Sequence, residues 1–315
     1  MYFIQAASTI SHQASFQNPG FFSSIKEIDP DAEFTPPNYR DYIDARALRR
    51  MSGLLRMSLA CAKDCLMQGR IDSPGAIVVG TGLGALADTE KFLVNFITIK
   101  DSLIPPTSFI QSTHNTVAGQ LSLILKNHNY NMTHTQNTLS FEHALQDSFL
   151  CLDEGSENVL VGATDEQIEF LDLLMKKLDV DSMQLTDGSS FFVLSKEKNE
   201  SALAQIKDVQ SDGLFTSFED RTDSFLKKNN LEIEDIDLVL FASLEAKTTD
   251  KIQTYFKDCE KVNYTNYCGT YMTNSAFAIH WAADEIQNEK YQRVLICNLL
   301  NPQNLGLTLI ESCEA

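Results

Sequence analysis

The sequence predicts an α/β protein in which mainly parallel strands alternate with helices. Short apolar runs suited to buried strands recur between longer segments of helical periodicity. This alternation runs through the chain twice, which indicates an internal pseudo-repeat, although no repeat of sequence is visible. No linker rich in Gly, Ser or Pro separates the two rounds. We therefore expect one compact unit, with an N-terminal half over residues 1–200 and a shorter C-terminal half over residues 201–315.

The composition limits the class of protein. The chain has 315 residues, of which 43% are hydrophobic and 22% charged, as in ordinary globular proteins. No apolar run approaches the roughly 18 residues that span a bilayer, and the first residues, MYFIQAAST, lack the basic segment of a signal peptide. We expect a cytoplasmic protein with no membrane span. The net charge of −18 argues against a nucleic-acid partner and disfavours direct docking on another acidic protein.

The seven cysteines lie mostly in apolar segments, which suits buried thiols in a reducing compartment better than a disulfide framework. Cys61 and Cys65 share one face of a helix, but no second pair completes a zinc site. We expect core cysteines and no metal.

Apolar periodicity predicts each element in order. In the N-terminal half, the sequence predicts strands over residues 2–8, 157–162 and 189–195, an irregular segment over 9–36, a helix over 44–68, a strand, glycine turn and helix start over 75–88, and a buried helix over 115–125. In the C-terminal half, it predicts helices over 218–229, 250–256 and 275–286 and strands over 237–242, 293–298 and 306–310.

The glycine turn contains Gly80, Gly82 and Ala85 at the spacing of a dinucleotide fingerprint. However, this motif does not open the first βαβ unit of the chain. We therefore expect a tight turn that needs small residues for packing, and no cofactor.

Residues 130–150, YNMTHTQNTLSFEHALQDSFL, predict a strand that turns abruptly into a buried helix. Residues 130–134 alternate, residues 136–140 form a polar link, and an apolar stripe of helical period follows from Phe141. Backbone N–H groups at such a helix start can receive a developing anion and favour a thiolate. This elbow is where we expect the decisive chemical position of the chain.

Several segments resemble the β-ketoacyl-ACP synthase family of the thiolase fold. YIDARALRRMSGLLRMSLACAKDCL resembles its arginine-bearing helix, STHNTVAGQLSLIL its buried helix before the nucleophile, and SENVLVGATDE the strand after the nucleophile helix. VVGTGLGALADTEKF, DGSSFFVLSKE and NYCGTYMTNSAFAIHWAADEI resemble further segments of the family in the same order. The resemblance implies two pseudo-repeated βαβ halves in α-β-α-β-α layers.

Carried over residue by residue, the resemblance implies that the family's catalytic residues are missing. Counting forward from Gly119 and backward from Val159 places the nucleophilic cysteine at Thr138. Ser243 stands for the first histidine, after a small gap. The lysine and the second histidine are replaced as well, by Thr265 and Thr270 respectively. The glycine-rich C-terminal loop is replaced by LLNPQNL.

Condensation needs a thiolate and imidazole donors for the enolate oxygen, and a threonine hydroxyl is a poor nucleophile without a base. We therefore predict no catalytic residues and no independent condensing activity. Two enzymatic alternatives stay open, an acyltransferase or a malonyl-ACP decarboxylase that uses Thr138 or Cys268. His134 or His143 would then be the base nearest in sequence to Thr138. We interpret Cys268 as a structural thiol, Gln136 as at most a polar pocket residue, and the Asp165–Glu166 pair as a solvated face.

The resemblance implies a chain-length-factor-like subunit that forms a heterodimer with an active β-ketoacyl-ACP synthase. The strand over residues 130–136, with His134 and Gln136, would form the contact. Residues 103–109 would help to wall the partner's acyl tunnel, with Ser108 and Phe109 at its end. Acyl carrier protein is itself acidic, so we expect it to dock mainly on the partner. Such pairs make polyketide or aryl-polyene type chains; a homodimeric acyl-binding protein is the remaining alternative.

Overall fold

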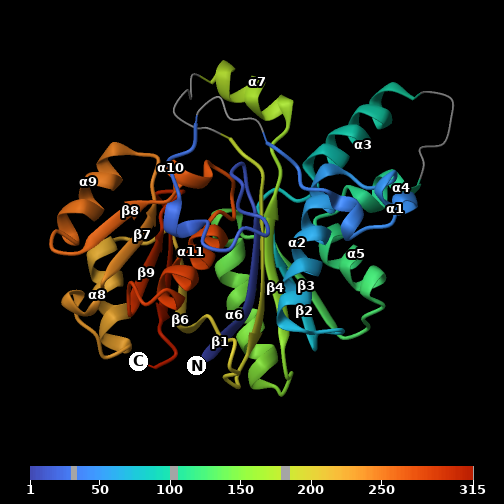
Figure 1. Cartoon of the computed structure of the whole chain (residues 1–315). Coiled ribbons are helices and arrows are strands. Elements are labelled where there is room, and N and C mark those ends of the chain that lie inside the picture. Colours follow the sequence, from blue (N-terminus) through green and yellow to red (C-terminus); the bar gives the residue numbers. More distant parts are fainter. Residues whose placement is uncertain (30–33, 100–105, 179–184, 315) are drawn as a thin grey trace.

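In the computed structural model, residues 1–29, 34–99, 106–178 and 185–314 are described, and within them ten strands form one continuous sheet (Figure 1). The order of the strands is β3-β2-β4-β5-β1-β6-β10-β9-β7-β8. They are β1 (Tyr2–Ile10), β2 (Ala76–Gly80), β3 (Tyr130–His134), β4 (Val159–Asp165), β5 (Gly188–Ser195), β6 (Ala204–Gly213), β7 (Leu238–Ala242), β8 (Glu260–Asn263), β9 (Arg293–Asn298) and β10 (Asn304–Glu311).

The predicted pseudo-repeat is present in the order of the strands. Read outward from the middle of the sheet, β1-β5-β4-β2-β3 on one side matches β6-β10-β9-β7-β8 on the other. The two series meet where Tyr2–Ile4 of β1 pairs with Ala204–Ile206 of β6. The prediction of mainly parallel pairing is wrong, because β2 and β7 pair in parallel with their neighbours but the five other pairings are antiparallel.

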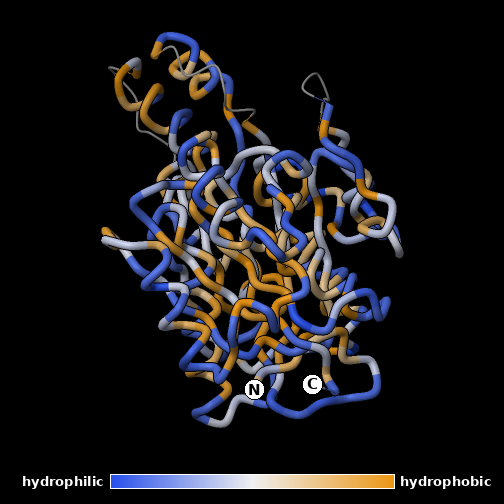
Figure 2. Tube along the Cα trace, turned by 90° about the vertical axis from the view of Figure 1, so that its left-hand side faces the viewer, coloured by the Kyte–Doolittle hydropathy of each residue, from blue (hydrophilic) through white to orange (hydrophobic). Residues whose placement is uncertain are grey.

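The helices complete the expected five layers. They are α1 (Ala45–Leu48), α2 (Gly53–Gly69), α3 (Leu86–Thr98), α4 (Pro106–Gln111), α5 (Thr116–Leu125), α6 (Ser140–Asp153), α7 (Glu169–Lys177), α8 (Phe218–Lys228), α9 (Ala246–Tyr255), α10 (Thr265–Cys268) and α11 (Ser275–Gln287). Helices α6 and α11 form the middle layer, since α6 packs on β2 and β4 but also on β6 and β10, while α11 packs on β1, β5, β9 and β10. Helix α2 covers β1 and β5 from outside, and α8 packs on β10. Along the chain trace, hydrophobic residues are concentrated in the middle of the molecule and hydrophilic residues toward its outside (Figure 2).

The middle layer is stable because its helices are apolar on more than one face. In α6, Phe141, Ala144 and Leu145 are fully buried in a core cluster that also takes in Ala276 and Phe277 of α11. Each fully buried large side chain contributes about 1.5–3 kcal/mol of transfer free energy. The start of α6 is thereby fixed against both halves of the sheet.

The helix predicted over residues 44–68 is interrupted. Asp44 caps the short α1 by accepting the N–H groups of Arg46 and Ala47, and α2 begins only at Gly53. Ser52 has the extended backbone of a helix N-cap, so the Ser52–Gly53 step starts a second helix inside one continuous apolar pattern. Within the described residues, no helix has both the length and the apolar character needed to cross a membrane.

Candidate functional site

The elbow is built as the sequence predicts, from β3, a single 3-10 turn over Asn137–Leu139, and α6. Asn137 has a left-handed backbone with φ of 55° and is exposed, while Thr138 beside it is only 3% exposed. Strain of this kind is uncommon outside glycine and marks a sharply turned elbow.

Thr138 is held by two asparagines from the other half of the sheet. Asn298, at the end of β9, donates from Nδ2 to the carbonyl oxygen of Thr138 at 2.7 Å and to Oε1 of Glu142 at 2.8 Å. Asn304, at the start of β10, donates to Oγ1 of Thr138 at 3.1 Å. Within the described residues, Thr138 has no hydrogen bond to a histidine or carboxylate, so its hydroxyl lacks an activating base.

The other three positions that the resemblance aligns with catalytic residues lie together. Ser243, Thr265 and Thr270 line one pocket of about 410 Å³, which Glu27 and Ile28 also line. The N–H of Ile28 donates to the carbonyl of Asn266 at 2.8 Å and fixes this segment over the pocket. Thr138 is not among the lining residues. The pocket therefore presents hydroxyl groups and a carboxylate, with no thiol, imidazole or amine.

The prediction of a solvated Asp165–Glu166 face is wrong, since the two residues are only 1% and 7% exposed. Asp165 Oδ1 accepts bonds from Thr81 Oγ1 and from the N–H groups of Gly82 and Leu83, at 2.9 to 3.1 Å. Its Oδ2 accepts from both the N–H and Oγ1 of Thr273, at 3.1 and 2.8 Å.

Asp165 therefore joins the glycine turn after β2 to the segment that follows Thr270. Burial raises the pKa of its carboxyl, and the five donors oppose that rise. We interpret Asp165 as a positioning residue that sequence reasoning missed. An acidic pair directly after a buried strand was the available indication, because the carboxyl ends of β2 and β4 share one edge of the sheet.

The glycine turn packs tightly against neighbouring residues and leaves no room for a side chain at Gly80 or Gly82. A Cβ on Gly82 would lie 2.2 Å from the Cβ of Met272, and one on Gly80 would lie 2.7 Å from the carbonyl oxygen of Ser140. The N–H groups of Gly82 and Leu83, which a phosphate would use, already bond to Asp165. The small residues of this turn are explained by packing.

In the described part of the chain, strand β3 lies at the end of the sheet and pairs with β2 alone. Met132 and Tyr130 are exposed on it. His134 Nε2 lies 2.8 Å from Oδ2 of Asp147, which also accepts from Tyr130 Oη. His143 stacks on His134 with ring centroids 6.4 Å apart, and burial, together with the charge of His134, lowers the pKa of His143.

The remaining predicted site residues are distributed as follows. Gln136 is exposed at the start of the 3-10 turn. Ser108 is half-buried on α4, and Phe109 is 58% exposed there with its ring 5.7 Å from that of Phe92 on α3. Of the predicted tunnel segment over residues 103–109, residues 103–105 lie outside the described residues. The Sγ of Cys268 is buried, and burial raises the pKa of its thiol far above the usual range.

Comparisons with known proteins agree with this architecture. Residues 27–176 match the family model of the beta-ketoacyl synthase N-terminal domain. The ishigamide ketosynthase/chain length factor structure matches with a TM-score of 0.79 over 99% of both chains, at 14% identity. The chain therefore has the thiolase-type fold of these ketosynthase structures, and its residues 27–176 are similar to the N-terminal domain of beta-ketoacyl synthases.

Two further solved structures match the chain. A beta-ketoacyl synthase from Burkholderia phymatum STM815 matches over 99% of both chains, with a TM-score of 0.75 and 11% identity. The ketosynthase ApeO in complex with its chain length factor ApeC from Xenorhabdus doucetiae matches over 68% of this chain and 84% of that one, with a TM-score of 0.55 and 18% identity. No curated protein sequence matches the chain.

Proposed function

We propose that this ketosynthase-like chain is a non-condensing, chain-length-factor-like subunit of a heterodimer with an active β-ketoacyl-ACP synthase. The proposal is carried by the side chains at the four positions that the resemblance aligns with the family's catalytic residues, none of which is a thiol, imidazole or amine. Ser243, Thr265 and Thr270 contribute hydroxyl groups to one pocket, and Thr138 is held by asparagines. A hydroxyl without a base does not attack a thioester, and hydroxyl groups do not replace two imidazoles at a developing enolate.

The contact with the partner would run along β3. Its outer edge is unpaired in the described part of the chain, and an open edge of this kind can pair with another strand. Exposed apolar side chains also lie on two helices that pack on each other, at Leu93, Val94, Phe96 and Ile97 of α3 and Phe109 and Ile110 of α4. Contiguous exposed apolar side chains mark interaction surfaces.

Within this proposal, α4 limits the growing acyl chain. Phe109 is anchored on Phe92 and projects into solvent, so its ring can fill space that belongs to a partner. Side-chain volume there would set the length of a polyketide or aryl-polyene type product. The net charge of −18 makes the partner the main docking surface for an acidic acyl carrier protein.

The enzymatic alternatives have less support. Thr138 has no hydrogen-bonded base, and Cys268 is a buried thiol whose raised pKa keeps it protonated. A homodimeric acyl-binding protein would use the same β3 edge, and is therefore an outcome of the test below.

Co-expression with a ketosynthase from the same gene neighbourhood tests the pairing. We expect the two chains to co-purify as a heterodimer. Met132→Asp, which places a charge on the exposed face of β3, is expected to weaken association at least about tenfold, because a desolvated unpaired charge costs several kcal/mol. Affinity is measured by sedimentation or interferometry.

The matched control is Leu214→Asp, which adds the same charge at an exposed apolar position. Leu214 directly follows β6, a central strand of the sheet that is separated from β3 by four other strands. This substitution should leave pairing unchanged. A stable homodimer that excludes the ketosynthase, or malonyl-ACP decarboxylation by the isolated chain that Thr138→Ala abolishes, would replace the proposal with one of its alternatives.

A further inference from the structure

A second cavity lies where the two halves of the sheet separate. Strand β1 pairs with β6 only as far as Ile4, and beyond that residue no strand covers this side of β1 within the described residues. The N–H of Leu203 donates to the carbonyl of Ile4 at the point of separation. The resulting cavity, which we call the β1 cleft, has a volume of about 780 Å³, within the range of small-molecule sites.

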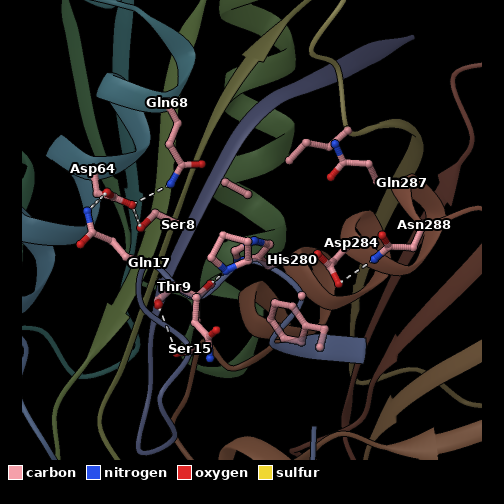
Figure 3. Close-up of a pocket in the computed structure, with 16 residues that line it drawn as sticks. Ser8, Thr9, Ser15, Gln17, Asp64, Gln68, His280, Asp284, Gln287 and Asn288 are labelled. Atoms are coloured by element: carbon pink, nitrogen blue, oxygen red, sulfur yellow. Dashed lines mark hydrogen bonds between the residues drawn. The ribbon is translucent and has the colours of Figure 1, made fainter. Parts of the chain in front are cut away.

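The β1 cleft shares no lining residue with the pocket of substituted catalytic positions. Figure 3 shows Ser8, Asp64 and Gln68 on one side of it, Asp284, Gln287 and Asn288 on the other, and His280 between them. These residues come from β1, α2 and α11, so three layers of the fold hold the cleft in shape.

One side of the cleft is formed by the buried carboxylate of Asp64, each oxygen of which accepts two hydrogen bonds. Asp64 accepts from Ser8 Oγ and Gln68 Nε2 at one oxygen, both at 2.7 Å. Gln17 Nε2 and Tyr42 Oη donate to the other oxygen at 3.0 Å. Because the side-chain amide N–H of Gln68 donates to Asp64, the side-chain carbonyl oxygen of Gln68 is left to accept a hydrogen bond from a ligand.

The middle of the cleft is an uncharged histidine. His280 Nδ1 lies 2.8 Å from Oγ1 of Thr9, which is also bonded to Ser190. Burial lowers the pKa of His280 to about 4, so the ring is neutral at physiological pH. Its Nε2 has no hydrogen-bond partner within the described residues and is available to a ligand.

The acidic residues that line the cleft disfavour a negatively charged ligand. Among the described residues, no lysine or arginine lines the cleft, and the acidic residues that line it are Asp64 and Asp284. Asp284 is half-buried and accepts one bond, from Asn288 Nδ2 at 3.2 Å, so it retains capacity for a positive donor. A phosphorylated or carboxylated molecule would bury its charge without a counter-charge, which is costly.

We propose that the β1 cleft binds a small polyhydroxylated molecule, uncharged or carrying one amino group, with Asp284, His280 and Gln68 receiving its hydroxyl and amino donors. This inference is independent of the proposed function, because β3 and the pocket of substituted positions take no part in it.

Ligand-observed NMR on the full-length chain tests this assignment with glucosamine, glucose and glucose 6-phosphate. We expect glucosamine to bind with a dissociation constant near the millimolar range, glucose more weakly, and glucose 6-phosphate not at all. Asp284→Asn should lower the affinity for glucosamine about tenfold and leave that for glucose unchanged, because it removes only the charge. His280→Leu should weaken both sugars.

The matched control is Asp250→Asn on the exposed surface of α9, which should bind all three molecules as the wild type does. Circular dichroism confirms that each variant is folded. Equal binding of glucose 6-phosphate, unchanged glucosamine binding in both cleft variants, or no binding of either sugar at about 10 mM would each overturn the proposal.

Discussion

At the scale of single residues, Asn137 and Thr138 divide between them the features of a nucleophile elbow. Counting along the sequence selects Thr138, which is buried and bonded to two asparagines. The left-handed backbone belongs to Asn137, which is exposed. In elbows of this type the nucleophile occupies the strained residue itself. The position chosen by sequence and the position chosen by conformation therefore differ by one residue.

Alkylation of introduced cysteines distinguishes the two positions. We expect iodoacetamide to modify Asn137→Cys at least about tenfold faster than Thr138→Cys, because residue 137 is exposed whereas residue 138 is only 3% exposed. Mass spectrometry of tryptic peptides measures both rates, with buried Cys268 as the unreactive internal control. Faster modification at position 138 would place the elbow where counting places it.

Glu166 gives the fold a pH dependence. Its carboxylate accepts from the N–H of Ala87 at 2.9 Å, and burial, with Asp88 and Asp187 nearby, raises its pKa from 4.5 to about 7. A native pKa above the unfolded value means that folding binds a proton. The stability that this proton contributes is complete below pH 4.5 and is lost as the pH rises through 7. The total is about 3 kcal/mol.

Glu166→Gln keeps an oxygen for Ala87 but does not titrate. The free energy of unfolding of the wild type, relative to this variant, is expected to fall by about 3 kcal/mol between about pH 4 and pH 8. Urea denaturation across this range measures it. Glu200→Gln, at an exposed position, should run parallel to the wild type. If the Glu166→Gln profile did so too, the raised pKa would be wrong.

At the scale of elements, apolar periodicity predicted those strands and helices whose pattern is unbroken, as in α6, α11 and β9. It missed β6 because a bulge breaks the alternation. Ile206 pairs with Ile310 and Asp208 with Leu309, which leaves Lys207 without an opposite residue. As a result Ile206 and Val209 are both buried although they lie three residues apart.

The site was predictable only in those features that depend on side-chain type, and not in those that depend on contacts between distant residues. Counting along the sequence assigns Ser243, Thr265 and Thr270 to catalytic positions of the family, which stays a prediction, and the structure brings the three residues to one pocket. The burial of Asp165 was not predictable, because its partners Thr81 and Thr273 lie 84 and 108 residues away. Hydrogen bonds at such separations leave no local pattern in a sequence.

At the scale of the whole molecule, we propose that the halves before and after residue 200 unfold as one unit. Only three residue pairs join β1 to β6, but α6 and α11 each pack on strands of both halves. Removing either half would expose one face of each middle helix. The hydrophobic core cluster that these two helices share is therefore the main packing contact between the halves.

The single tryptophan, Trp281, tests this cooperativity. It is buried on α11, in the C-terminal half, and donates to Oε1 of Glu285 at 3.3 Å. We expect its fluorescence and the far-ultraviolet circular dichroism, which reports on both halves, to change with the same urea midpoint. Two separated midpoints would show that the halves unfold independently.

The open edge of β3 also has a consequence for how the chain must be made in a cell. An uncovered strand edge can pair with another extended segment, including the same strand of a neighbouring copy. Copies synthesised in excess of whatever covers β3 would enter aggregates or be degraded. Under the proposed heterodimer, the abundance of this chain is tied to the supply of its partner, and the two chains need to be translated at matched rates.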